Sequence, residues 1–256
     1  MRSVELASDD RLRAASDLYR GYAPLEVSYG TVRDYCEGAD LFPALSCYNR
    51  DLKDIQRIWV LKTIMATVPV GGTLLEIGAG EPVIADILGR LGYRVIAVDP
   101  YEGAGNGPVE VEVFKELYPN LEYNLALFST ELEGVEPHSI DCCYSISVLE
   151  HIPLPELAKI GDAIRKFSKP GGRSIHAVDY VAGGPGSDYH FSMVATVFEA
   201  HRLSLQSLHR ILTEADRDAE TYWLSAESHN LWRGERPYDE FPMRRCLSLQ
   251  IACDVP

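Results

Sequence analysis

Four residues near the middle of the chain have the types and spacing of a nucleotide-binding turn. Glu76, Gly78 and Gly80 lie at the end of one apolar run, before a segment of helical character. Asp99 follows Gly78 by 21 positions, at the end of the next apolar run. Glycines let the backbone turn tightly and approach a ligand, and an acid after the second strand suits the hydroxyls of a ribose. The pattern therefore predicts a strand, a ligand-binding turn, a helix and a second strand.

Two departures from the dinucleotide-binding fingerprint narrow the class of ligand. Val83 replaces the third glycine of G-x-G-x-x-G, and the acid Glu76 occupies a strand position that is normally apolar. The free N–H groups at the start of the following helix suit a carboxylate, Glu76 suits an ammonium, and Asp99 suits a ribose. S-adenosylmethionine (SAM) carries all three groups. The residues therefore favour SAM over a ligand with a pyrophosphate, such as NAD.

Four motifs in the same order are found in a known family. They are E-I-G-A-G-E at 76–81, V-D-P at 98–100, I-D-C-C-Y-S-I-S-V-L-E-H-I at 140–152 and K-P-G-G at 169–172. Together they resemble the class I SAM-dependent methyltransferases, over about residues 70–180. The resemblance implies an α/β fold with helices on both faces of a seven-stranded, mostly parallel sheet. It also implies that the last strand is antiparallel and that SAM lies above the first, second and fourth strands of that core.

The predicted contacts to SAM combine the turn with residues further along the chain. Members of the resembled family often carry an acid after the third strand that binds adenine, whereas residues 125–130 here read L-A-L-F-S-T. We expect Phe128 to pack on the adenine, and Ser129 or Thr130 to hydrogen bond with it. The predicted cofactor-binding residues are Glu76, Gly78, Ala79, Gly80, Asp99, Pro100, Phe128, Ser129 and Ser145.

Two histidines are candidates for a catalytic base. Methyl transfer from a sulfonium is an in-line displacement, so a base is needed only if the acceptor holds its proton tightly. His151 follows the fourth core strand, beside the expected position of the methyl group, and His190 follows the fifth in a glycine-rich loop of the kind that covers substrates in the resembled fold. The alternatives are that His151 anchors a turn and that His190 caps a helix. Glu150 is expected to face solvent or to act through another residue.

Composition excludes several classes of partner. The 256 residues carry a formal net charge of −14 at pH 7, which repels nucleic acid, and no local Lys/Arg cluster offsets it. No apolar run has the ~20 residues of a membrane span, and residues 1–10 do not read as a secretory signal. The six cysteines lack metal-site spacing and suggest reduced thiols in a cytoplasmic protein. We predict no metal site, because His176 and Asp179 face opposite sides of a regular strand.

Strand and helix patterns alternate through most of the chain, which predicts one α/β domain. Residues 1–70 are expected to form a helical, lid-like segment, with Gly30, Gly38 and Pro43 as breakers, and residues 71–256 the SAM-binding core. We predict helices over about 9–22, 51–68, 82–92, 109–118, 155–167, 192–201 and 204–215. We predict strands over about 73–77, 94–99, 121–128, 141–148, 173–180, 220–227 and 244–253, the last two as a terminal pair.

Three functions compete at this point. The first is SAM-dependent methylation of a small-molecule or carrier-bound acceptor, with oxygen slightly favoured over nitrogen or carbon. The second is a NAD-dependent oxidoreductase, against which Glu76 and Val83 argue. The third is a SAM-fold binding protein without catalytic activity, against which the complete set of predicted cofactor residues argues. No feature of the sequence points to a particular oligomeric state.

Overall fold

The structure, a computed structural model, describes residues 8–46, 51–103, 107–184, 186–224 and 245–256. These residues form a seven-stranded sheet in the order β1-β7-β6-β5-β2-β3-β4. Strands β2 to β6 run parallel, and β7 is antiparallel to both of its neighbours. The strands are β1 (Val27–Tyr29), β2 (Thr73–Ile77), β3 (Arg94–Val98), β4 (Glu122–Asn124), β5 (Ile140–Ile146), β6 (Ser168–Gly183) and β7 (Arg245–Asp254).

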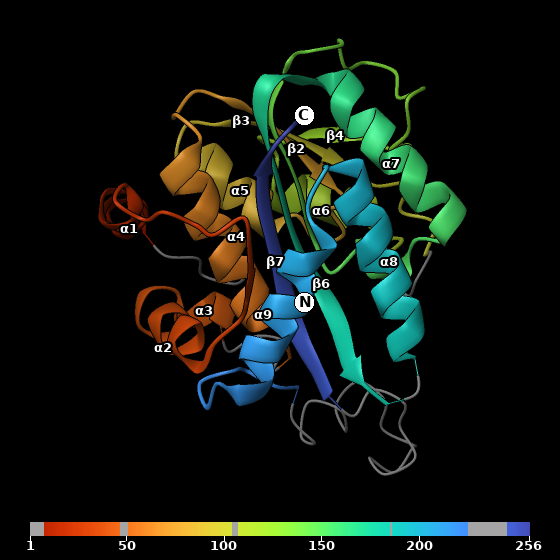
Figure 1. Cartoon of the computed structure of the whole chain (residues 1–256). Coiled ribbons are helices and arrows are strands. Elements are labelled where there is room, and N and C mark those ends of the chain that lie inside the picture. Colours follow the sequence, from red (N-terminus) through yellow and green to blue (C-terminus); the bar gives the residue numbers. More distant parts are fainter. Residues whose placement is uncertain (1–7, 47–50, 104–106, 185, 225–244) are drawn as a thin grey trace.

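Helices cover both faces of the sheet (Figure 1). One apolar core lies between the sheet and α1 (Asp9–Tyr19), α4 (Lys53–Thr67) and α5 (Val83–Arg90). The other lies between the sheet and α7 (Leu154–Phe167), α8 (Ser187–Ala200) and α9 (Leu205–Arg217). The remaining described helices are α2 (Val32–Leu41), α3 (Pro43–Ser46), α6 (Val111–Leu117) and the short 3₁₀ turn η2 (Leu149–His151). The predicted α/β architecture is confirmed.

The edge of the sheet differs from the prediction. Residues 220–227 were expected to pair with the last strand, but Thr221 and Trp223 make only isolated bridges, and 225–227 lie outside the described residues. The outermost strand is β1, which pairs with β7 from Val27↔Ile251 to Tyr29↔Leu249. The chain therefore completes its sheet with a strand from the N-terminal segment.

The N-terminal segment contributes to the core, and its role as a lid stays a prediction. Helix α4 packs on the central strands, and Trp59 is only 1% exposed. Gly38 was predicted to break structure, yet it lies inside α2. A Cβ atom there would come within 2.2 Å of Ser46 Oγ and 2.7 Å of an Ile58 carbon. The glycine therefore permits close packing of α2 on α3 and α4.

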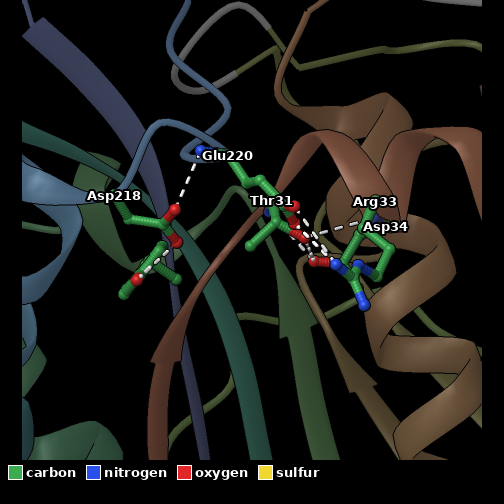
Figure 2. A network of polar contacts seen from close by, with 6 residues as sticks. Thr31, Arg33, Asp34, Asp218 and Glu220 are labelled. Atoms are coloured by element: carbon green, nitrogen blue, oxygen red, sulfur yellow. Dashed lines mark hydrogen bonds and ion pairs between the residues drawn. The ribbon is translucent and has the colours of Figure 1, made fainter.

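A polar network joins β1 and the start of α2 to the residues after α9 (Figure 2). Thr31 and Asp34 form a reciprocal capping box at the N-terminus of α2. Across the junction, Arg33 Nη2 lies 3.1 Å from both carboxylate oxygens of Glu220, and the Tyr29 hydroxyl donates to Asp218 Oδ2 at 2.8 Å. The Arg33 pair is exposed and adds little stability, so the partly buried Tyr29 bond is the stronger link.

The described cysteines are free thiols, as predicted: Cys36, Cys142, Cys143, Cys246 and Cys253, with Cys47 outside the described residues. Within the described ranges, no helix has the length and apolar character needed to cross a membrane.

Candidate functional site

The predicted glycine turn joins β2 to α5. Gly78 has φ +66° and Gly80 has φ +52°, a left-handed region that favours glycine. The N–H groups of Gly78 and Ala79 both donate to the carbonyl of Val98, at 2.9 and 3.2 Å. The turn is therefore hydrogen-bonded to Val98, which ends β3 and directly precedes Asp99.

The Asp99 carboxylate is held against this turn. Its Oδ2 accepts the N–H of Gly80 at 3.0 Å, and its Oδ1 accepts the N–H of Tyr101 at 2.7 Å. The Tyr101 hydroxyl donates back to the Gly80 carbonyl at 2.9 Å. Each carboxylate oxygen can accept more than one hydrogen bond, so both remain able to accept bonds from a ligand. Pro100 follows, partly buried.

Glu76 lies buried on the α4 side of the sheet. It is 4% exposed and pairs in register with Tyr144 of β5. Burial raises the pKa of Glu76 to about 8, although the nearby Tyr144 hydroxyl and Arg57 guanidinium oppose that rise. Its Oε2 atom has no hydrogen-bond donor among the described residues. The nearby Tyr144 hydroxyl is also buried without a partner among these residues, so this pair of polar groups has capacity left for a ligand.

Three other predicted cofactor contacts have side chains that the protein uses internally. Phe128 is buried with its ring centroid 6.2 Å from that of Phe167, so it packs in the core. Ser129 Oγ accepts the N–H of Glu131, which closes a turn. The Ser145 side chain is fully buried, and its Oγ lies 2.8 Å from His176 Nδ1. The Ser145 hydroxyl thus belongs to a core network rather than to the surface of the glycine turn.

Leu125 and Leu127 were not singled out from the sequence. They follow β4 and are 49% and 70% exposed. In a mostly parallel sheet, ligands bind at the carboxyl ends of the strands, where these leucines lie. In the sequence they alternate with Ala126 and Phe128, which pack in the core. This alternation is the signal that could have identified them as exposed.

A tight contact joins the glycine turn to the residues after β5. A Cβ atom on Gly78 would lie 2.6 Å from Val148 Cγ1, so only glycine fits there. The backbone then turns sharply at Ser147, which has φ +56° and donates its N–H to Ala177 at 2.8 Å. Non-glycine residues in this conformation are uncommon and occur often at functional sites. This turn leads into η2, which carries Glu150 and His151.

Glu150 points inward, contrary to the expectation that it faces solvent. It is 6% exposed, and its Oε1 accepts the backbone N–H of Asp179 at 3.0 Å. Burial, followed by the nearby Asp179 carboxylate, raises the pKa of Glu150 to about 8. Burial also raises the pKa of Asp179. The short turn η2 therefore brings an acid into contact with the end of β6.

The geometry of His190 suits a proton acceptor. Its Nδ1 lies 2.9 Å from the backbone carbonyl of Asp179, which can only accept, so Nδ1 carries the proton and Nε2 keeps its lone pair. Burial lowers the pKa of His190. The neutral imidazole lies edge-on to the rings of Tyr180 and Tyr189.

The structure brings the two predicted catalytic histidines into one neighbourhood. The charge of His151 acts on both His190 and Asp179, and the His151 side chain is exposed. His176 and Asp179 face opposite sides of β6, as predicted: His176 bonds Ser174 and Ser145, whereas Asp179 bonds Gln56 of α4. No group of three or more His, Cys, Asp or Glu within the described ranges is arranged to hold a metal ion.

Comparisons with known proteins agree with this arrangement. A family model described as a methyltransferase domain matches residues 48–241. A ubiquinone biosynthesis O-methyltransferase from Nitrosococcus oceani is 31% identical over 104 residues, which cover 40% of this chain and 42% of that protein. An uncharacterised protein from Mycobacterium tuberculosis is 29% identical over 143 residues, 56% of this chain and 42% of that protein. The chain thus matches less than half the length of these curated relatives.

Solved structures show the same fold at low sequence identity. Geranyl diphosphate C-methyltransferase from Streptomyces coelicolor A3(2) has a TM-score of 0.51 at 12% identity, with 96% of this chain and 98% of that chain covered. The 1,6-didemethyltoxoflavin-N1-methyltransferase from Burkholderia thailandensis also has a TM-score of 0.51, at 15% identity, with 97% and 91% covered. Both structures hold S-adenosylhomocysteine. At this identity the likeness establishes the fold.

Proposed function

Because the chain belongs to the methyltransferase-domain family, we propose that it transfers the methyl group of SAM to a small-molecule acceptor, free or carrier-bound. The observation that carries this proposal is the placement of Asp99 on the glycine turn, through its bond to Gly80. Buried Glu76, with an oxygen that lacks a donor, lies behind the same turn. A ribose and an ammonium are the groups that these two carboxylates recognise best.

The two alternatives fit the site less well. Val83, which replaces the third glycine of a NAD fingerprint, is buried at the start of α5 and packs in the core. A buried carboxylate at Glu76 has no role in binding a pyrophosphate. A binding protein without activity would need the cofactor residues but not the arrangement of His190, whose acceptor nitrogen is fixed by its bond to Asp179.

The residues assigned to SAM have distinct tasks. Asp99 binds the ribose hydroxyls, Glu76 attracts the ammonium, and the turn from Gly78 to Gly80 lets the backbone approach closely. Leu125 and Leu127 supply an apolar surface for the adenine in place of an acid. SAM supplies a methyl group on a sulfonium that is already activated. The protein's part is to align the acceptor and to take up its proton.

We propose oxygen as the methylated atom, with His190 Nε2 as the proton acceptor. A neutral imidazole matches the task of taking a proton from a hydroxyl near pH 7. His190 meets this requirement because its pKa is lowered by burial and its tautomer is fixed by the Asp179 carbonyl. His151, exposed at the end of η2, is the second candidate for this role.

Turnover with three classes of acceptor tests this function. The protein is incubated with SAM and a catechol, a primary amine or an activated methylene compound, and S-adenosylhomocysteine is measured. We expect product with the catechol, and loss of product in the Asp99→Ala variant. Failure of all three acceptor classes together with failure to bind SAM would exclude the proposed function. Product from the amine or the carbon acid alone would exclude oxygen as the methylated atom.

A further inference from the structure

The inward-facing acid on η2 has more acceptor capacity than its surroundings use. Glu150 Oε1 accepts the Asp179 N–H, but the buried Oε2 has no hydrogen-bond donor within the described residues. Leaving a buried carboxylate oxygen without a donor is unfavourable. The mechanism proposed above does not use this atom, so its position needs another explanation.

Further acceptors without donors surround the neighbouring acid. Gln56, which is fully buried, donates from Nε2 to Asp179 Oδ1 at 2.8 Å. Its Oε1 has no donor in the described part of the chain. The Ser248 hydroxyl, on the residue that pairs in register with Asp179, is also buried without a partner there. The unpartnered oxygens of Glu150 and Gln56 can only accept when Glu150 is ionised, and the hydroxyls of Ser147 and Ser248 are the donors nearby, so a ligand that completes the site brings N–H groups.

The charges around this site favour a cation. Asp51, two residues before α4, lies close enough that the Asp179 carboxylate adds to burial in raising the pKa of Asp51 to about 6. The groups that oppose these acids are Lys53, His151 and His190, and burial lowers the pKa of His190. The whole chain carries a net charge of −14, which raises the local concentration of cations.

We propose that the carboxyl groups of Glu150 and Asp179 form a subsite that binds a cationic nitrogen group of the methyl acceptor. This inference rests on the proposed function and extends it to the class of substrate. The subsite adjoins the base, because His190 donates to the Asp179 carbonyl. It also adjoins the cofactor turn, because Val148, two residues before Glu150, packs against Gly78. An acceptor anchored here by an ammonium extends its nucleophilic atom toward the space between His190 and the cofactor turn.

Two probes of the same shape test the subsite in the intact protein. Benzylamine, which is cationic at pH 7, and benzyl alcohol, which is neutral, are titrated calorimetrically into the protein saturated with S-adenosylhomocysteine. We expect the cationic probe to bind at least about tenfold more tightly, the difference that a charge-assisted bond of about 1.5–3 kcal/mol produces. Equal affinity for the two probes, or no binding of either, would overturn the proposal.

Charge-neutral variants locate the effect. Glu150→Gln and Asp179→Asn each keep the shape of the side chain, and each should lose most of the preference for benzylamine. Glu156→Gln is the control, because that acid lies exposed on α7 beside Lys159 and its replacement changes the net charge equally. The control should keep the full preference. If all three variants match the wild-type preference, the subsite lies elsewhere and the proposal fails.

Binding of S-adenosylhomocysteine separates this inference from the proposed function. A protein that binds it but does not distinguish the probes would refute the subsite and leave the methyltransferase function standing. A protein that fails to bind it would refute the function itself. If Glu150→Gln does not fold, the comparison of the two probes on the wild-type protein and on Asp179→Asn still decides the matter.

Discussion

At the scale of single residues, Asp99 has two tasks that one substitution removes together. Its carboxylate fixes the turn through Gly80 and Tyr101, and in our proposal it also binds the ribose. We expect Asp99→Ala to weaken SAM binding by at least about 1.5 kcal/mol, roughly tenfold in Kd. Calorimetric titration measures this, with the melting temperature as a check on folding. An unchanged Kd in a folded variant would show that Asp99 does not bind the cofactor.

His190 and His151 differ in burial, and their variants should differ accordingly. We expect His190→Ala to lower kcat by about 10²–10⁴ at saturating SAM and catechol, and His151→Ala to lower it much less. Because burial lowers the pKa of His190 from its ordinary value near 6.5, the fall in wild-type kcat on acidification should begin at a lower pH than for an exposed histidine. If both variants keep near-normal kcat, the acceptor reaches the site already ionised and no histidine acts as base.

The glycine turn and its partner Asp99 could be predicted from the sequence, whereas the internal contacts of Phe128, Ser129 and Ser145 and the inward position of Glu150 could not. Glu76, Gly78, Gly80 and Asp99 belong to one local strand-turn-helix-strand unit, so spacing alone brings them together. Glu150 faces inward because its carboxylate reaches an N–H on β6, far away in sequence. Contacts of that kind leave no periodic signal in the chain.

At the scale of elements, the glycine turn and the turn after β5 must fit each other. Gly78→Ala would place a Cβ atom 2.6 Å from Val148, in a backbone conformation that already disfavours a side chain. We expect it to destabilise the fold by about 1–3 kcal/mol, and Val148→Ala to recover part of that loss by making room. Urea unfolding of both single variants and the double variant measures the coupling. Strict additivity would show that the two turns do not contact each other in solution.

The edge of the sheet shows where element prediction fails. Residues 27–29 form a strand too short for periodicity to reveal, and it is stable because it pairs with the long strand β7. Residues 220–224 have strand-like composition, but they make only two single bridges, from Thr221 to Thr31 after β1 and from Trp223 to Leu247 of β7. Pairing partners distant in sequence, not local propensity, decide which of two short segments joins a sheet.

At the scale of the whole molecule, buried imidazoles should make stability depend on pH. His176 and His201 lie in a buried chain with Ser145 and Ser174, and burial lowers the pKa of both histidines. Above pH 6.5 both imidazoles are neutral in the folded and unfolded states. Below pH 6.5 the unfolded chain binds protons that the native state does not bind. The free energy of unfolding therefore falls by up to about 1.4 kcal/mol per pH unit for each histidine.

Urea unfolding at pH 7.5 and 5.5 measures this loss. The buried acids act in the opposite sense, since the pKa values of Glu76 and Glu150 are raised to about 8 and their contribution is lost as pH rises from about 4.5 through 8. His201→Gln removes one buried imidazole and so isolates its contribution to the pH dependence of stability. His209→Gln is the matched control, because His209 is exposed. The wild type and the control should lose more stability between the two pH values than His201→Gln. Equal losses in all three would contradict the account of the buried chain.

The whole arrangement of turn, Glu76 and Asp99 makes one claim: this fold binds SAM and not a dinucleotide. Calorimetric titration of the purified protein with SAM, and separately with NAD, tests it most directly. We predict saturable binding of one SAM per chain and no heat of binding with NAD. Binding of NAD in place of SAM, or binding of neither by a folded protein, would contradict it.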